Sequence, residues 1–99
     1  MDKKPTATYK IVDTFKITGR GLVFGGEIID GQISVGDFIE FPVANKTRRK
    51  KITAIESARS IHPDRKTGLL IKCDDDAEID EIRNSPPNNM LALIYKADT

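Results

Sequence analysis

The stretch "FKITGRGLVFGGEIIDGQISVGDFIEF", Phe15 to Phe41, decides the fold. Between its glycines the residues are mostly β-branched, aromatic or otherwise apolar, as strands require. The glycines are Gly19, Gly21, Gly25, Gly26, Gly31 and Gly36. Because glycine inside a strand marks a bulge, a tight bend or a close backbone approach, the stretch predicts strands that bend sharply. Closing a small sheet into a barrel requires such bends.

Strand patterns continue on both sides of this stretch. Residues 8–17 alternate, which predicts a half-buried strand with its apolar residues on one face. Those residues are Tyr9, Ile11, Phe15 and Ile17. Further strands are expected at residues 22–29, 37–43, 51–58, 68–73 and 90–95. The last is a continuous apolar run, which favours a strand buried on both faces.

The connections are short and polar. Asp30-Gly31 predicts a tight turn after the second strand, and residues 45–51 predict a polar connection. Residues 75–83 form the one helical candidate, because Asp75 and Glu78 have capping-box spacing. The sequence therefore predicts an all-β fold: a small closed antiparallel β-barrel of about six strands, with one short helix or turn near 75–83. The barrel is expected to span residues 8–99, after a flexible N-terminus at 1–7.

Composition limits the classes of function. The 99 residues fit one domain, and 16 Lys plus Arg against 15 Asp plus Glu leave no general positive field for polyanions. A polyanionic partner would need a local patch. The charged start of the chain, and the lack of any run approaching ~20 apolar residues, predict a soluble cytoplasmic protein without membrane contact. The single Cys73 is consistent with a reducing compartment.

Catalytic and metal-binding patterns are weak. His62 is the only histidine and Cys73 the only cysteine, so neither a zinc cluster nor a Cys-His pair is expected. The acidic run from Asp74 fails the calcium-loop test, because Ile79 and Ser85 stand where glycine and glutamate are needed. We therefore expect no metal, no cofactor, no bound nucleotide and no enzymatic activity.

Within the opening stretch, a set of residues matches one family motif in register. They are Phe15, Ile17, Gly19, Arg20, Gly21, Val23, Gly26, Gly31, Ile33, Gly36 and Asp37. In these residues the chain resembles the second domain of elongation factor Tu and related translational GTPases, over about residues 9–72. The resemblance implies a closed antiparallel barrel. No phosphate-loop motif is present, so it implies a free-standing barrel without the GTPase domain.

The resemblance also implies a binding site for the 3′ end of transfer RNA, or for ribosomal RNA. The implied positions are Phe15, Ile17, Arg20, Glu56 and Arg59. Apolar side chains can sandwich a base, Arg20 can pair with phosphate, and Glu56 can accept from hydroxyl or amino groups. Three alternatives stay open: Phe15 and Ile17 also fit core packing, Arg20 also fits a solvated cation in a tight turn, and Glu56 also fits a surface ion pair.

A basic cluster is a further RNA-binding candidate. Its members are Lys46, Arg48, Arg49, Lys50 and Lys51, which either contact phosphates or form a solubilising hairpin. The sequence thus predicts a non-enzymatic module that binds RNA of the translation machinery. The alternative is a protein-protein interaction module that keeps the barrel without the RNA pocket and binds a separate translation factor or another protein.

Overall fold

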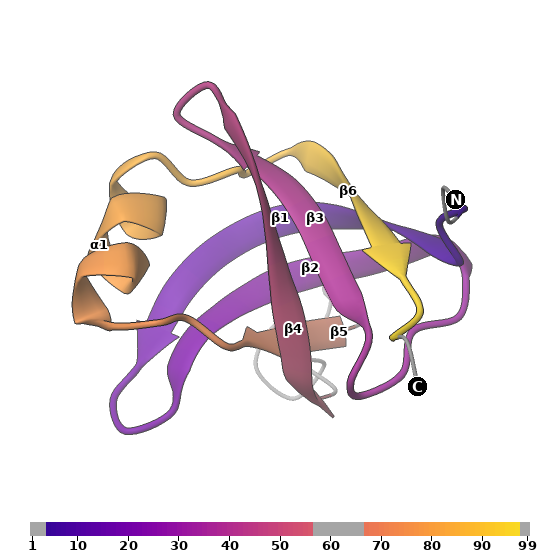
Figure 1. Cartoon of the computed structure of the whole chain (residues 1–99), viewed down its shortest axis with the longest axis horizontal. Helices are drawn as coiled ribbons and strands as arrows, with labels where there is room; N and C mark the ends of the chain where they lie inside the picture. The colour runs from indigo at the N-terminus through magenta and orange to yellow at the C-terminus, as the bar shows by residue number, and fades with distance from the viewer. Residues whose placement is uncertain (1–3, 57–66, 98–99) are drawn as a thin grey trace.

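A computed structural model describes residues 4–56 and 67–97, which form a closed six-stranded antiparallel barrel with one short helix (Figure 1). The elements are β1 (Ala7–Ile17), β2 (Gly21–Gly31), β3 (Phe38–Val43), β4 (Lys46–Glu56), β5 (Thr67–Ile71), α1 (Asp76–Asn84) and β6 (Met90–Tyr95). Around the barrel the strands are ordered β1-β2-β5-β4-β3-β6, and β6 pairs with β1 to close it. The predicted small all-β barrel is confirmed.

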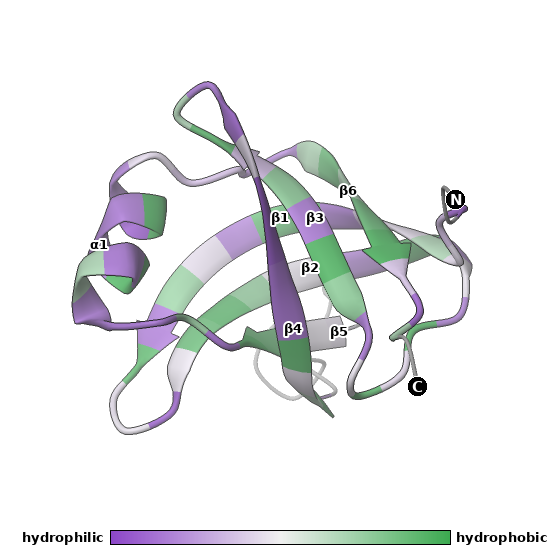
Figure 2. Ribbon diagram, viewed as in Figure 1, coloured by the Kyte–Doolittle hydropathy of each residue, from purple (hydrophilic) through white to green (hydrophobic). Residues whose placement is uncertain are grey.

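Alternate residues of the strands fill the barrel interior, as the period of a strand requires. The rings of Phe24 and Phe41 meet edge to face at its centre, with centroids 4.8 Å apart. Figure 2 shows that β4 is largely hydrophilic along its first half, whereas β2, β3 and β6 carry the hydrophobic residues. The first half of β4 therefore contributes less to the hydrophobic core than the other strands do.

Tyr9 on β1 forms side-chain hydrogen bonds to two other strands inside the barrel. Its side chain is fully buried, and its hydroxyl lies 3.0 Å from the carbonyl oxygen of Phe24 and 2.7 Å from that of Thr67. Burial raises the pKa of this phenol well above its ordinary value, so the hydroxyl stays protonated and can donate. A donor on β1 thereby joins acceptors on β2 and β5.

A β-bulge divides β1 into two halves. Ile11 opposes Gly26 and Asp13 opposes Gly25, so Val12 is an extra residue without its own partner on β2. One extra residue reverses the alternation of every side chain beyond it. Tyr9 and Ile11 are buried in the core, whereas Phe15 is 40% exposed. The prediction that Phe15 and Ile17 share a face with Tyr9 and Ile11 is therefore wrong.

Two predicted connections are also wrong. Residues 45–51 are mostly strand, because the β3–β4 turn consists only of Ala44 and Asn45, whose φ angles of 48° and 70° fit a type I′ hairpin. Asp30-Gly31 makes no tight hairpin, because β2 pairs with β1 and β5 rather than with β3. In both cases a strand segment was predicted to be a loop, because its residues are polar or include glycine.

The remaining elements follow the sequence more closely. In α1 the Asp75 carboxylate caps the helix by accepting the Glu78 N–H at 2.9 Å, as the capping spacing predicts. The bounds of β6 match, but its burial on both faces does not: Leu91 is 60% and Leu93 36% exposed. A strand of a single closed barrel has only one face toward the core. Among the described residues, no helix is long and apolar enough to cross a bilayer.

Gly26 provides a test of the barrel's packing. A Cβ at this position would overlap the carbonyl oxygen of Lys10 and lie 3.1 Å from the Tyr9 ring. We expect Gly26→Ala to lower the free energy of unfolding by more than about 2 kcal/mol, because backbone as well as side chain must shift. Urea denaturation measures this.

The matched control is Gly68→Ala, whose Cβ would have its nearest neighbour at 3.6 Å, an ordinary contact. We expect it to change stability by less than about 1 kcal/mol. Equal effects of the two substitutions would contradict the close-approach argument.

Candidate nucleic-acid interface

An apolar row crosses four strands on the outer face of the barrel. The strand register places Phe15 opposite Val23, Val23 opposite Leu70, and Leu70 opposite Ala54. Directly opposed residues project to the same face with Cβ atoms about 5 Å apart. Val23 is buried, Leu70 and Ala54 are half-buried, and Phe15 is exposed. Phe15 therefore presents its ring to solvent at the β1 end of this row.

An ion pair spans this surface. Arg20 Nη1 lies 2.8 Å from Glu56 Oε2, with the two side chains 42% and 50% exposed. Arg20 sits in the β1–β2 turn, where its N–H donates to the Ile17 carbonyl, and Glu56 is the last residue of β4. An exposed pair of this kind contributes under about 1 kcal/mol. Both charged groups can therefore exchange partners with an incoming ligand at little cost.

The structure thus brings four predicted site residues to one region of the surface. Ile17 follows Phe15 on the outer side of β1, is half-buried and lies beside the Arg20 turn. None of Phe15, Ile17, Arg20 and Glu56 is fully buried, so core packing does not account for them. The fifth predicted residue, Arg59, lies outside the described residues.

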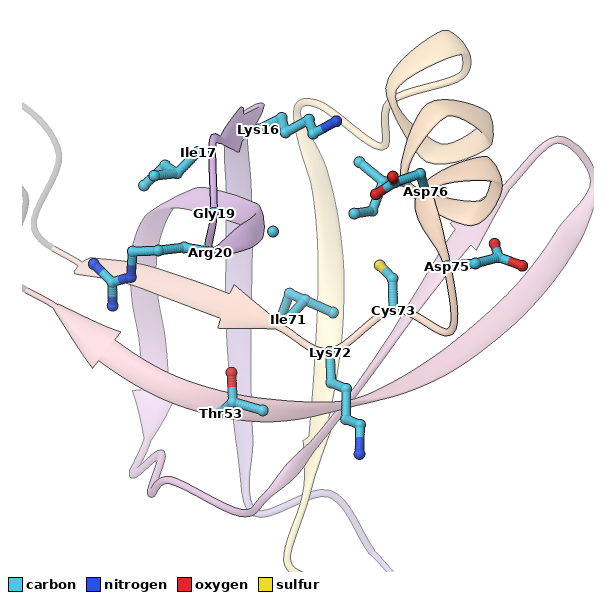
Figure 3. A pocket seen from close by; sticks show the side chains of 12 residues that line it. Lys16, Ile17, Gly19, Arg20, Thr53, Ile71, Lys72, Cys73, Asp75 and Asp76 are labelled. Atoms are coloured by element: carbon cyan, nitrogen blue, oxygen red, sulfur yellow. The ribbon is translucent and has the colours of Figure 1, made fainter.

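A cleft of about 320 Å³ adjoins this region, between the β1–β2 turn, the end of β5 and the start of α1 (Figure 3). Its cationic lining residues are Lys16, Arg20 and Lys72, and Asp75 and Asp76 are its carboxylates.

The Cys73 thiol also lines this cleft. Burial, and next the Glu78 carboxylate, raise the pKa of Cys73 to about 11, so this thiol is protonated at neutral pH and a poor nucleophile or metal ligand.

The basic cluster is divided between two faces of β4. Lys46, Arg48 and Lys50 oppose Val43, Phe41 and Ile39, which all belong to the core. These three cations therefore lie on the inner face of the β3–β4 hairpin. Arg49 and Lys51 lie on the outer face.

Helix α1 neutralises two of the three inner cations, Arg48 and Lys50. Glu78 is only 10% exposed; its carboxylate lies 3.0 Å from Arg48 Nη1 and 2.7 Å from Lys50 Nζ, and also accepts the Asp74 N–H at 2.7 Å. Glu81 contacts Arg48 as well. Burial alone would raise the pKa of Glu78, but Lys50, the Asp74 amide and Arg48 together lower it below its ordinary value. The geometry therefore favours Arg49 and Lys51 as the members of the cluster open to a ligand.

Several residues of this interface escaped the sequence analysis. For Leu70 the sequence contains a usable signal: it alternates with the core residue Leu69, which predicts that Leu70 faces outward. For Lys16 and Lys72 the sequence contains no such signal, because their positions beside the cleft depend on the Val12 bulge and on where β5 ends.

The described residues contain no group of three or more metal-ligating side chains. No protein-family model matches the chain, so its resemblance to translation factors stays a prediction.

The α1 ion pairs lead to a prediction of acid sensitivity. Because the pKa of Glu78 is lower in the folded than in the unfolded protein, its stabilisation is present above the ordinary glutamate value near 4.3 and is lost as pH falls through the folded-state pKa. We expect Glu78→Gln to cost about 2 kcal/mol at pH 7 and to make the loss of stability below about pH 4.3 shallower. Thermal melts from pH 3 to 7 measure both effects.

Glu81→Gln is the control, because the Glu81 side chain is 52% exposed. Its expected cost is under about 1 kcal/mol at pH 7. Identical pH profiles for wild type and Glu78→Gln would contradict the role assigned to Glu78.

Proposed function

We propose that this chain is a non-enzymatic module of the cytoplasm that binds RNA of the translation machinery, either the 3′ end of transfer RNA or ribosomal RNA. The site is the outer face of β1, β2, β5 and β4. One observation carries the proposal: the exposed Phe15 ring and the exchangeable Arg20–Glu56 pair border the same apolar row. The motif resemblance independently selects the same residues.

The chemistry of these groups suits an unpaired nucleotide. A base that stacks on an aromatic ring gains ~1–3 kcal/mol, and Phe15 offers that ring next to Val23. Arg20 can turn from Glu56 to a phosphate oxygen, forming a charge-assisted hydrogen bond. Glu56, once released, can accept from the ribose 2′-hydroxyl or 3′-hydroxyl, and a contact to the 2′-hydroxyl distinguishes RNA from DNA.

A second candidate function is protein-protein interaction. The observation that favours it is the exposure of two large apolar side chains on the outer face of β6, Leu91 at 60% and Leu93 at 36%. Contiguous exposed apolar surface is typical of interaction sites. A separate translation factor or another protein would be the partner. This surface is on β6, a strand that the Phe15 row does not cross, so the two functions can be tested separately.

The RNA proposal is tested by fluorescence anisotropy with a labelled trinucleotide that ends in adenosine with a free 3′-hydroxyl. We expect Phe15→Ala and Arg20→Ala each to weaken binding about tenfold, because each removes one stacking or charge-assisted contact. Arg83→Ala is the control, since it removes an exposed cation from the last turn of α1 that does not line the cleft.

Leu91→Lys should leave RNA binding unchanged, because Leu91 belongs to the β6 surface. Two results would contradict the proposal. One is the absence of trinucleotide binding at low salt. The other is equal weakening by Arg20→Ala and Arg83→Ala, which would indicate general charge attraction without a site.

A further inference from the structure

A second aromatic and basic surface lies on the outer face of β4, β3 and β6. The register places Lys51 opposite Phe38, and Phe38 opposite Tyr95. Their neighbours Ile39 and Ile94 are fully buried in the core, so these three residues face outward. Phe38 and Tyr95 are half-buried and Lys51 is exposed.

Arg49 is held over the Tyr95 ring. Its guanidinium carbon lies 4.4 Å from the ring centroid, and its Nη2 lies 3.0 Å from Glu40 Oε2. Glu40 is the residue directly opposite Arg49 on β3. The Arg49 side chain is nevertheless 48% exposed. A guanidinium held in place and open to solvent is a surface on which an unpaired base can stack.

Lys51 and Lys72 lie between this stack and the Phe15 row. The Lys72 N–H donates to the Lys51 carbonyl oxygen at 3.0 Å, so the two residues are adjacent across β4 and β5. Both are exposed, and neither has an ion pair with the described residues. In Figure 3 the Lys72 side chain extends away from α1. These lysines contrast with Arg48 and Lys50, whose charges α1 neutralises.

The spacing fits a continuous strand of RNA. Lys51 precedes Ala54, the end of the Phe15 row, by three residues along β4, or ~10 Å. Tyr95 lies two strands from β4, which is ~10 Å across the sheet. Ala54, at the near end of the Phe15 row, is thus about 14 Å from Tyr95, and Phe15 lies three strands, or another ~14 Å, further along the row. This span is within the reach of the roughly four to sixteen nucleotides that comparable barrels bind.

We propose that Arg49 and Tyr95 form a second base-stacking subsite, and that Lys51 and Lys72 bind the phosphates that connect it to the Phe15 row. The ligand class is single-stranded RNA longer than a trinucleotide. This inference rests on the proposed function and deepens it, because it defines the path of the RNA around the barrel. Glu40 positions Arg49 and does not contact the RNA.

The experiment compares the binding of a trinucleotide and of an octanucleotide with the same 3′ end, both by anisotropy. Wild type should bind the octamer more tightly. Tyr95→Leu and Lys51→Gln should each weaken octamer binding about fivefold or more and leave trinucleotide binding unchanged. Lys51→Gln should also lower the salt slope for the octamer by about 0.7. Lys46→Gln is the matched control: it removes the same charge from the inner face of the same strand and should change neither affinity.

The outcomes separate the two proposals. If the octamer binds no more tightly than the trinucleotide, or if Lys51→Gln and Tyr95→Leu leave its affinity unchanged, the second subsite is wrong and the Phe15 site stands. If wild type binds neither RNA, both proposals are wrong. If Tyr95→Leu lowers the melting temperature, weaker binding by this variant can result from loss of folding. The test of the second subsite then rests on Lys51→Gln alone, because Lys51 is exposed and outside the core. An effect of Lys46→Gln equal to that of Lys51→Gln also overturns the subsite.

Discussion

The extra residue Val12 determines which side chains of β1 reach the surface. Without this bulge the alternation of Tyr9 and Ile11 would continue, and Phe15 and Ile17 would point into the core. With it, Thr14 and Lys16 occupy the inner side, where Thr14 hydrogen-bonds Asn88 in the loop before β6. The outer side then carries the apolar row. The interface therefore depends on a local insertion in the backbone as much as on residue type.

Charge is distributed between the two sides of the barrel by α1. Along β4 the basic residues alternate between faces, and a cation on the inner face needs a counter-charge because it is partly removed from water. Glu78 supplies that charge to Arg48 and Lys50 at once. On the outer face Arg49 pairs with Glu40, and Lys51 is exposed to solvent or a ligand. The near-neutral net charge of +1 thus conceals a surface whose positive groups are locally concentrated.

The sequence predicted features that local chemistry determines. The number of strands, the barrel and the Asp75 cap all follow from patterns within a few residues. The errors concern register and burial, which depend on distant segments: nothing around Val12 indicates a bulge, and β4 looks like loop until α1 is known to cover its cations. For the candidate site, Phe15, Arg20 and Glu56 lie in one outer region of the barrel, and that they bind RNA stays a prediction of the family resemblance. The motif did not identify Leu70 or Lys72, which join them only through strand pairing.

The central claim is that the outer face beyond the Val12 bulge holds RNA, and amide chemical-shift mapping tests it most directly. Isotopically labelled wild-type protein would be titrated at low salt with an aminoacylated 3′ fragment of transfer RNA. The account predicts fast or intermediate exchange shifts that cluster at Phe15, Arg20, Glu56 and Leu70, while the amides of α1 stay in place. An unchanged spectrum at low salt, or shifts centred on α1, would contradict it.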